Sequence, residues 1–133
     1  MRAAGRIMIE QGSGSVINIS SIRGYSPNPG RMTYCSAKAA VIMMTKIAAG
    51  EWAEHGVRCN AIAPGVLRTP MWDSDVARGI IDEPFYLDLV PAKRLGTPAD
   101  VGALAVYLAS DAAAYVNGST IAIDGALTSI PAG

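Results

Sequence analysis

A tyrosine and a lysine four residues apart, Tyr34 and Lys38, are the residues of this sequence best suited to proton transfer. Residues at this spacing share one face of an α-helix, so a phenol and an ammonium can reach the same space. A free tyrosine has a pKa of about 10 and is a poor acid or base near neutral pH, but a neighbouring cation favours its phenolate. The pair alone is a weak signal, because a surface tyrosine with its lysine in solvent has the same spacing.

Two serines, Ser20 and Ser21, directly follow a β-branched apolar run at 16–19 that is typical of a buried strand. Ligands bind at the carboxyl ends of strands in open α/β sheets, and Ser21 lies 13 residues before Tyr34. A loop of this length lets both hydroxyls converge on one carbonyl oxygen, where the serine holds it and the tyrosine moves the proton. Taken alone, the serines are better explained by ordinary turn chemistry.

Helices and strands alternate along the chain, judged by apolar periodicity and turn residues. We expect helices over 2–11, 32–54 and 97–109, short helical stretches near 73–80 and 83–90, and strands over 16–19, 57–63 and 119–123. A loop at 20–31 and a loose tail at 128–133 complete the chain. Thr97, Pro98 and Asp100 resemble a capping box with proline in the first turn. The alternation predicts a parallel sheet covered by helices, the α/β class.

The composition argues against several classes of partner. The 133 residues carry 11 Lys+Arg and 11 Asp+Glu, so no basic excess points to nucleic acid or to an anionic membrane surface. Hydrophobic residues make up 50%, yet no uncharged apolar run reaches the roughly 18 residues of a membrane span. Residues 1–11 carry charges where a secretion signal needs a long apolar centre. We therefore expect a core-rich cytoplasmic domain with neither nucleic-acid nor membrane partners.

Neither a disulfide framework nor a metal site is expected. Cys35 and Cys59 lie far apart without a histidine at metal-ligand spacing, which favours two small, buried or partly buried residues of a reducing compartment. The single histidine, His55, fits a surface cation at a helix C-terminus. The acidic residues between 73 and 88 fit a solvated helix face better than a metal cluster.

Six short motifs occur in order along nearly the whole chain. They are Asn18-Ile19-Ser20-Ser21, Tyr34-Cys35-Ser36-Ala37-Lys38, Asn60-Ala61-Ile62-Ala63-Pro64-Gly65 with Thr69, the segment 91–101, Leu108-Ala109-Ser110-Asp111 and Tyr115-Val116-Asn117-Gly118. Together they resemble the C-terminal half of a short-chain dehydrogenase/reductase, and several motifs at the right spacing are far more specific than one. The resemblance implies half of a doubly wound Rossmann fold, with three parallel strands, covering helices and a substrate-binding lobe at 67–93.

The resemblance implies an NAD(P)-dependent oxidoreductase that interconverts an alcohol and a ketone, with catalytic residues Ser21, Tyr34 and Lys38. Tyr34 is then the general acid/base for the substrate oxygen. Lys38 binds the nicotinamide ribose hydroxyls and favours the phenolate of Tyr34. Ser21, rather than Ser20, holds the substrate oxygen.

The resemblance also assigns binding residues. The Pro64-Gly65 turn lets backbone approach the nicotinamide, the Leu67 main chain reads its carboxamide, and Thr69 adds a hydroxyl contact. The expected substrate contacts are Ser21, Arg23, Tyr25 and Trp72. For the aromatic residues of the lobe, substrate contact and packing within the lobe are equally open; they are Trp72, Phe85 and Tyr86.

Some features of the resembled family have no counterpart in the 133 residues. There is no G-x-x-x-G-x-G run, and no residue can be identified that selects NAD or NADP, so the cofactor is expected to be one of the two. The family also implies a homo-oligomer, tetramer or dimer, when full length, and a left-handed crossover between the strands at 57–63 and 119–123.

Two other interpretations stay open. The chain could be a non-enzymatic remnant that at most associates with full-length subunits through the helix at 32–54 or the last strand. An unrelated α/β binding module is the third interpretation, and it requires every motif to be a coincidence.

We expect the 133-residue chain on its own to be marginally stable or prone to aggregation, because the strand at 16–19 and the helix at 32–54 leave apolar surface uncovered. It should also bind dinucleotide weakly. Thermal unfolding with increasing NAD or NADP is therefore expected to show no saturable rise in Tm. A saturable stabilisation of several degrees would contradict this expectation.

Overall fold

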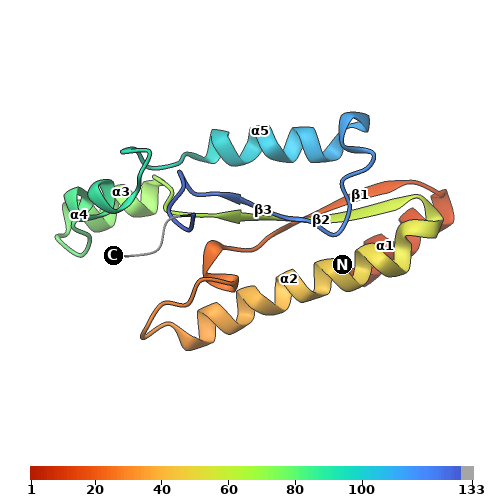
Figure 1. The fold of residues 1–133 in the computed structure, drawn as a ribbon, viewed down its shortest axis with the longest axis horizontal. Coiled ribbons are helices and arrows are strands. Elements are labelled where there is room, and N and C mark those ends of the chain that lie inside the picture. Colours follow the sequence, from red (N-terminus) through yellow and green to blue (C-terminus); the bar gives the residue numbers. More distant parts are fainter. Residues whose placement is uncertain (130–133) are drawn as a thin grey trace.

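Three parallel strands form one sheet between layers of helices in the computed structural model, which describes residues 1–129 (Figure 1). One face carries α1 (Arg2–Gln11) and α2 (Met32–Trp52), and the other carries α5 (Pro98–Ala109). The strands are β1 (Gly14–Ile19), β2 (Val57–Pro64) and β3 (Thr120–Ile123). Two short helices, α3 (Pro70–Ala77) and α4 (Glu83–Leu89), lie together at one end. The predicted α/β class and three parallel strands are confirmed; of the predicted tail, residues 130–133 lie outside the described residues.

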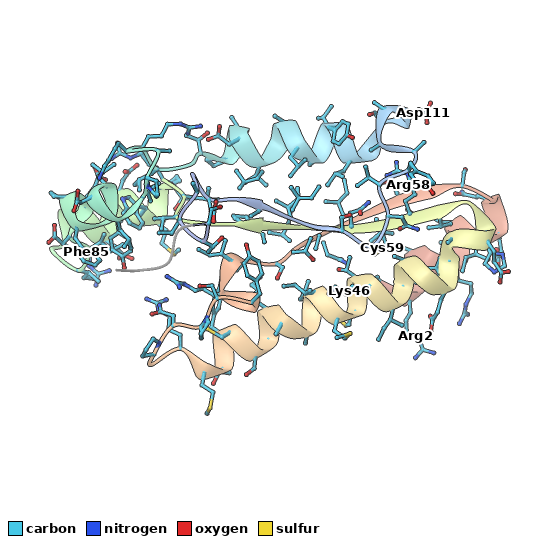
Figure 2. The ribbon with its side chains drawn as sticks, viewed as in Figure 1. Arg2, Lys46, Arg58, Cys59, Phe85 and Asp111 are labelled. Carbon is cyan, nitrogen blue, oxygen red and sulfur yellow. The ribbon has the colours of Figure 1, made fainter. Side chains whose placement is uncertain are left out.

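The central strand β2 pairs with β1 from Gly14–Val57 to Ile19–Ile62, and with β3 from Ala61–Thr120 to Pro64–Ile123. All of its residues except Arg58 are buried, as expected of a parallel strand covered on both faces. Successive side chains leave β2 on opposite faces, which Figure 2 shows for Arg58 and Cys59.

The two faces of the sheet carry separate apolar clusters. Cys59 packs with Ala48 and Ala49 of α2, and Val16 of β1 joins them. On the opposite face the cluster is formed by residues of β2, α5 and the turn after it, with partly buried neighbours from β1 and β3; its buried members are Ile62, Leu108 and Ala113. Each helix layer is thus held by its own half of the core.

The two crossovers of the sheet have opposite hands. The chain passes from β1 to β2 through α2 on one face and from β2 to β3 through α5 on the other, while the strand order steps in one direction. Two crossovers that step the same way over opposite faces cannot both be right-handed, so one is an exception to the usual rule. This agrees with the expectation of a left-handed crossover; its assignment to the β2–β3 connection stays a prediction.

Several element boundaries differ from the sequence expectation for local reasons. Helix α3 begins at Pro70, before the predicted residue 73, because Thr69 caps it by accepting a hydrogen bond from the Trp72 backbone N–H at 3.2 Å. Helix α2 ends at Trp52 and tightens into a 3₁₀ turn at Ala53–His55 before Gly56. Gly56 has a φ of 72°, the left-handed conformation expected just after a helix.

Helix α5 begins with the predicted capping box. The Thr97 hydroxyl accepts from the Asp100 backbone N–H at 3.3 Å, and the Asp100 carboxylate accepts from the Thr97 backbone N–H at 2.7 Å. Arg94 donates to the same carboxylate at 3.0 Å and 3.1 Å. The Arg94 guanidinium first, and the Thr97 bonds after it, hold the pKa of Asp100 well below its ordinary range.

Burial of the cysteines follows the sequence expectation: Cys59 is buried, Cys35 is partly buried, and both are free thiols. Within residues 1–129, no three His, Cys, Asp or Glu side chains come together in a way that could hold a metal ion. No helix of this part of the chain is long and apolar enough to cross a membrane.

The capping box gives stability a defined pH dependence. Because the folded-state pKa of Asp100 is lowered, its stabilisation is complete above the unfolded pKa of about 3.9 and is lost as the pH falls toward the folded value. We expect Asp100→Asn to lower the free energy of unfolding at pH 7, and the difference from the parent chain to shrink below about pH 4. Urea unfolding from pH 7 to pH 2 measures this.

The exposed carboxylate of Asp111, at the start of a 3₁₀ turn without a side-chain cap, offers the matched control Asp111→Asn. The control variant should differ little from the parent at any pH. An Asp100→Asn difference that stays constant across the pH range would show that the carboxylate charge does not stabilise the helix.

Candidate active site

A cavity of about 360 Å³ opens where β1 and β2 end, bounded by the first turns of α2 and by α3. This is the edge of a parallel sheet at which the carboxyl ends of neighbouring strands meet. The lining residues are Ile19, Ser20, Ser21, Tyr34, Lys38, Pro64, Gly65, Leu67, Thr69, Met71, Trp72, Asp75 and Ile81.

The two serines after β1 differ in what their hydroxyls do. The Ser20 hydroxyl donates to the Lys38 carbonyl at 2.8 Å, and the Ser20 backbone N–H donates to the Ile62 carbonyl at 2.8 Å. The Ser21 hydroxyl accepts from the Arg23 backbone N–H at 3.1 Å, which uses a lone pair and leaves its hydrogen available to donate. Ser20 therefore ties the loop to α2, whereas Ser21 can bind a ligand oxygen.

Tyr34 and Lys38 lie on the same side of α2, as their spacing predicts. The Lys38 ammonium is 5.8 Å from the centre of the Tyr34 ring. It donates to the Ile19 carbonyl at 3.2 Å, and an ammonium has two further hydrogens to offer a ligand. Tyr34 is 45% exposed, so its hydroxyl is accessible from the cavity.

The turn after Ser21 packs tightly on α2 and fixes the distance between the serine and the helix. The 3₁₀ turn at Ile22–Gly24 brings the Gly24 backbone so close to α2 that a Cβ at this position would lie 2.9 Å from the Lys38 carbonyl oxygen. Only a glycine permits this approach, because any side chain would push the turn away from the helix. The loop predicted at 20–31 is therefore ordered in its first half by this contact.

The segment that follows β2 forms the second wall of the cavity. The Gly65 backbone N–H donates to the Ile123 carbonyl at 2.8 Å, and a Cβ at Gly65 would lie 2.8 Å from the Asp124 Cα. Leu67 pairs with Gly96 in an isolated parallel bridge. The Thr69 hydroxyl accepts from the Trp72 backbone and keeps its own hydrogen for a ligand.

The lobe expected at 67–93 contains α3 and α4, and its aromatic rings contact one another edge-on. The Trp72 ring meets the Tyr86 ring edge-on at 5.1 Å, and Tyr86 meets Phe85 at 5.4 Å. Trp72 lines the cavity, whereas Phe85 is exposed at the outer end of the lobe (Figure 2). Packing within the lobe is therefore observed for all three aromatics, whereas contact of Trp72 with a substrate stays a prediction.

A partly buried hydrogen bond connects α3 with α4. The Trp72 indole N–H donates to the Glu83 carboxylate at 2.9 Å, and Glu83 also receives the Arg68 guanidinium. The bond from Trp72 first, and that from Arg68 second, lower the pKa of Glu83 from its ordinary value. Glu83 thus stays ionised at neutral pH.

All but two of the residues assigned from the sequence line this one cavity. The exceptions, Arg23 and Tyr25, line a separate hollow of about 240 Å³ with Cys35 on the outer side of the loop. Arg23 donates to the Pro27 carbonyl at 3.5 Å, and the Tyr25 hydroxyl lies 3.5 Å from Thr128. Their contact with substrate stays a prediction that this placement does not support.

Several residues that line the cavity are not among the site residues predicted from the sequence; Met71, Asp75 and Ile81 of the lobe are examples. Asp75 was assigned to a solvated face, but it lies one helical turn after Met71 and so shares its side of α3. The Thr69-Pro70 pair, a start signal of the same kind as Thr97-Pro98, could have placed the helix and revealed this face. Glu83 had no local signal, because its role comes from a contact between two helices.

Comparison with known proteins gives consistent matches. A family model described as enoyl-(acyl carrier protein) reductase matches residues 1–128. The chain is 39% identical over 127 residues to the 2-(R)-hydroxypropyl-CoM dehydrogenase of Xanthobacter autotrophicus, and 43% identical over 122 residues to the 3-oxoacyl-[acyl-carrier-protein] reductase of Thermotoga maritima. These matches cover 92% and 90% of this chain, and 49% and 48% of the relatives.

The fold is also similar to solved structures. The structure of ElxO with NADP bound matches with a TM-score of 0.93 and 35% sequence identity, over 98% of this chain and 52% of that one. The chain therefore spans about half the length of the proteins that it matches.

The close approach at Gly65 can be tested with two glycine substitutions. We expect Gly65→Ala to lower the free energy of unfolding by about 1–3 kcal/mol, because its Cβ meets backbone and the ends of β2 and β3 must separate. Gly50→Ala, inside α2 with nothing within 4 Å of the added carbon, should instead be neutral or stabilise by up to about 1 kcal/mol. Equal effects of the two substitutions in urea unfolding would contradict the close packing at Gly65.

Proposed function

The chain belongs to the short-chain dehydrogenase/reductase family, and we propose that its cavity interconverts an alcohol and a ketone with NAD or NADP. The observation that carries the proposal is the convergence of Ser21, Tyr34 and Lys38 on one cavity at the carboxyl ends of β1 and β2. Relatives that are named as dehydrogenases and reductases, and the NADP bound to ElxO, support it.

The donor groups of the cavity fit the nicotinamide end of such a cofactor. The Lys38 ammonium has hydrogens to offer the ribose hydroxyls, and the Thr69 hydroxyl and the Leu67 main chain suit a carboxamide. When bound, NAD(P) supplies or accepts the hydride at the substrate carbon. The chain's own residues supply placement and proton transfer.

Proton transfer follows from the positions of three side chains. The Ser21 hydroxyl donates a hydrogen bond to the substrate oxygen and fixes it near Tyr34. In reduction the Tyr34 hydroxyl gives its proton to that oxygen, and in oxidation its phenolate takes the proton back. The Lys38 ammonium lies 5.8 Å from the centre of the Tyr34 ring, so a ligand held by Lys38 lies next to the proton donor.

The remaining walls indicate which part of a substrate they contact. The lobe side of the cavity is mostly apolar, with Leu67, Met71, Trp72 and Ile81 among its residues. An apolar substituent of the alcohol or ketone would lie against this side.

We also propose a cytoplasmic homo-oligomer, tetramer or dimer. Helix α2 exposes large apolar side chains that a second subunit could cover; they are Met32, Met43, Met44 and Ile47.

The role of Tyr34 is tested best in a completed chain, defined as residues 1–133 joined behind the N-terminal half of the Thermotoga maritima relative. With NADPH or NADH and the N-acetylcysteamine thioester of 3-oxobutanoate, we expect Tyr34→Phe to lower kcat by about 10²–10⁴-fold. Circular dichroism and the urea midpoint should not change, because the ring is retained.

The matched control is Tyr115→Phe, since Tyr115 is fully exposed and lies outside the cavity. It should keep the activity of the completed chain. If Tyr34→Phe also kept near-normal turnover, the proposed proton donor would be wrong.

A further inference from the structure

The lobe side of the cavity rests on two helices that are too short to hold their shape alone. Helix α3 has 8 residues and α4 has 7, whereas isolated helices below about 12–15 residues are marginal in water. Each begins with its own cap: Thr69 accepts from the Trp72 backbone, and Asp82 accepts from the Phe85 backbone. These caps start the helices but do not join them. The Ile80 and Ile81 backbone N–H groups tie the connecting segment to the Asp75 carbonyl, and side-chain contacts then set how α4 lies against α3.

One carboxylate makes that connection. Glu83 lies in the first turn of α4. One of its carboxylate oxygens accepts a hydrogen bond from the Trp72 indole of α3, and the other accepts a hydrogen bond from the Arg68 guanidinium. The Arg68 backbone N–H in turn donates to the Gly96 carbonyl at 2.8 Å, next to the start of α5. A chain of contacts therefore runs from Gly96, just before α5, through Arg68 and Glu83 to the Trp72 indole.

The indole needs such a partner to stay in one orientation. Trp72 is only 9% exposed and lines the cavity, and its ring touches Tyr86 only edge-on. The second side-chain torsion of tryptophan has broad minima, so the torsion itself does not fix the plane of the ring and its contacts must do so. A buried indole N–H that lost its acceptor would turn to find another one.

We propose that Glu83 is a positioning residue that fixes the Trp72 indole as a wall of the substrate cavity, and so determines how large a substrate substituent the cavity accepts. Glu83 does not line the cavity itself and acts only through Trp72. The inference rests on the proposed function, because it assigns this wall to the substrate.

The role of the negative charge can be separated from that of the hydrogen bond. The Glu83 carboxylate is paired with Arg68, so its charge is balanced outside the cavity. Glu83→Gln keeps an oxygen that can accept the indole hydrogen and removes the charge, whereas Glu83→Ala removes both. A positioning role predicts that the glutamine variant resembles the parent and the alanine variant does not.

The hydrogen bond of the indole is followed by ¹⁵N–¹H spectra of the completed chain, in which residues 1–133 contribute two tryptophans. Trp72→Phe identifies the Trp72 indole signal. We expect this signal to lie downfield and to exchange slowly with solvent in the parent and in Glu83→Gln. In Glu83→Ala it should move upfield, and its exchange should become at least about tenfold faster.

The effect on substrate size is measured in the completed chain with N-acetylcysteamine thioesters of 3-oxobutanoate and 3-oxooctanoate. Glu83→Ala should raise KM for the longer substrate about tenfold or more while kcat stays within about twofold. The wall contacts a part of the substrate that does not react, so the bound substrate and the transition state lose the same binding energy. KM for the shorter substrate should change less than about twofold, and Glu83→Gln should restore the parent values.

Asp88→Ala is the matched control, because Asp88 is an ion-paired carboxylate on the same helix that bonds Lys93 and not Trp72. It should leave the indole signal and both KM values unchanged. The proposal is overturned if Glu83→Ala leaves the indole signal in place, if Glu83→Gln behaves like Glu83→Ala, if both substrates lose affinity equally, or if Asp88→Ala has the same effect.

The two proposals fail in different ways. Retained turnover in Tyr34→Phe would remove the proposed function, while the indole spectra would still decide the position of Trp72. Loss of turnover in Tyr34→Phe, together with an unchanged indole signal and unchanged KM in Glu83→Ala, would remove only the role of Glu83.

Discussion

The site depends on β2 being held in one register by both of its neighbours. Two asparagine side chains fix this register where β3 approaches: buried Asn60 of β2 donates to the Val116 carbonyl at 2.7 Å, and the Asn117 side chain accepts from the Cys59 backbone at 2.8 Å. Asn117 also donates to the Ala49 carbonyl of α2 at 3.2 Å. A shift by one residue would break these bonds, leave buried Asn60 without its acceptor and turn every side chain of β2 to the opposite face. The same register places the ends of β1 and β2, and so both walls of the cavity, at one edge.

Two parts of the chain form the cavity, the lobe at 67–93 and the body, by which we mean the sheet with α1, α2 and α5. They hold their cavity residues in place by different contacts. Ser21 and Tyr34 belong to segments fixed by the sheet, by the close contact of Gly24 with α2 and by the Ser20–Lys38 hydrogen bond. Trp72 belongs to a short helix that contacts α4 through side chains, while a few backbone bonds hold its two ends, such as Arg68 N–H to the Gly96 carbonyl and Ile80 N–H to the Asp75 carbonyl. Regions with few buried apolar contacts open more easily than the core of a protein, so we expect the residues proposed for proton transfer to lie on the more rigid part.

Sequence patterns predicted the parts of this structure that depend on local chemistry. The capping box at Thr97, the strand before Ser20 and the shared face of Tyr34 and Lys38 follow from spacing and residue type, and they are confirmed. The start of α3 was missed although Thr69-Pro70 signals it. The Trp72–Glu83 bond and the placement of Arg23 away from the cavity depend on how separate elements pack, which no local pattern records.

The lobe at 67–93 is held mostly by contacts among its own residues, and this affects how the sequences of related proteins can diverge. The residues that shape the lobe side of the cavity lie within one continuous stretch, 67–93, and their fixing contacts reach the body at few points. Substitutions there can accumulate without disturbing the serine, tyrosine and lysine, since those are held by other contacts. A new substituent could then be accommodated by changing a tryptophan or its carboxylate partner while the chemistry stays the same. If the proposed function holds, the architecture allows substrate range to evolve separately from proton transfer.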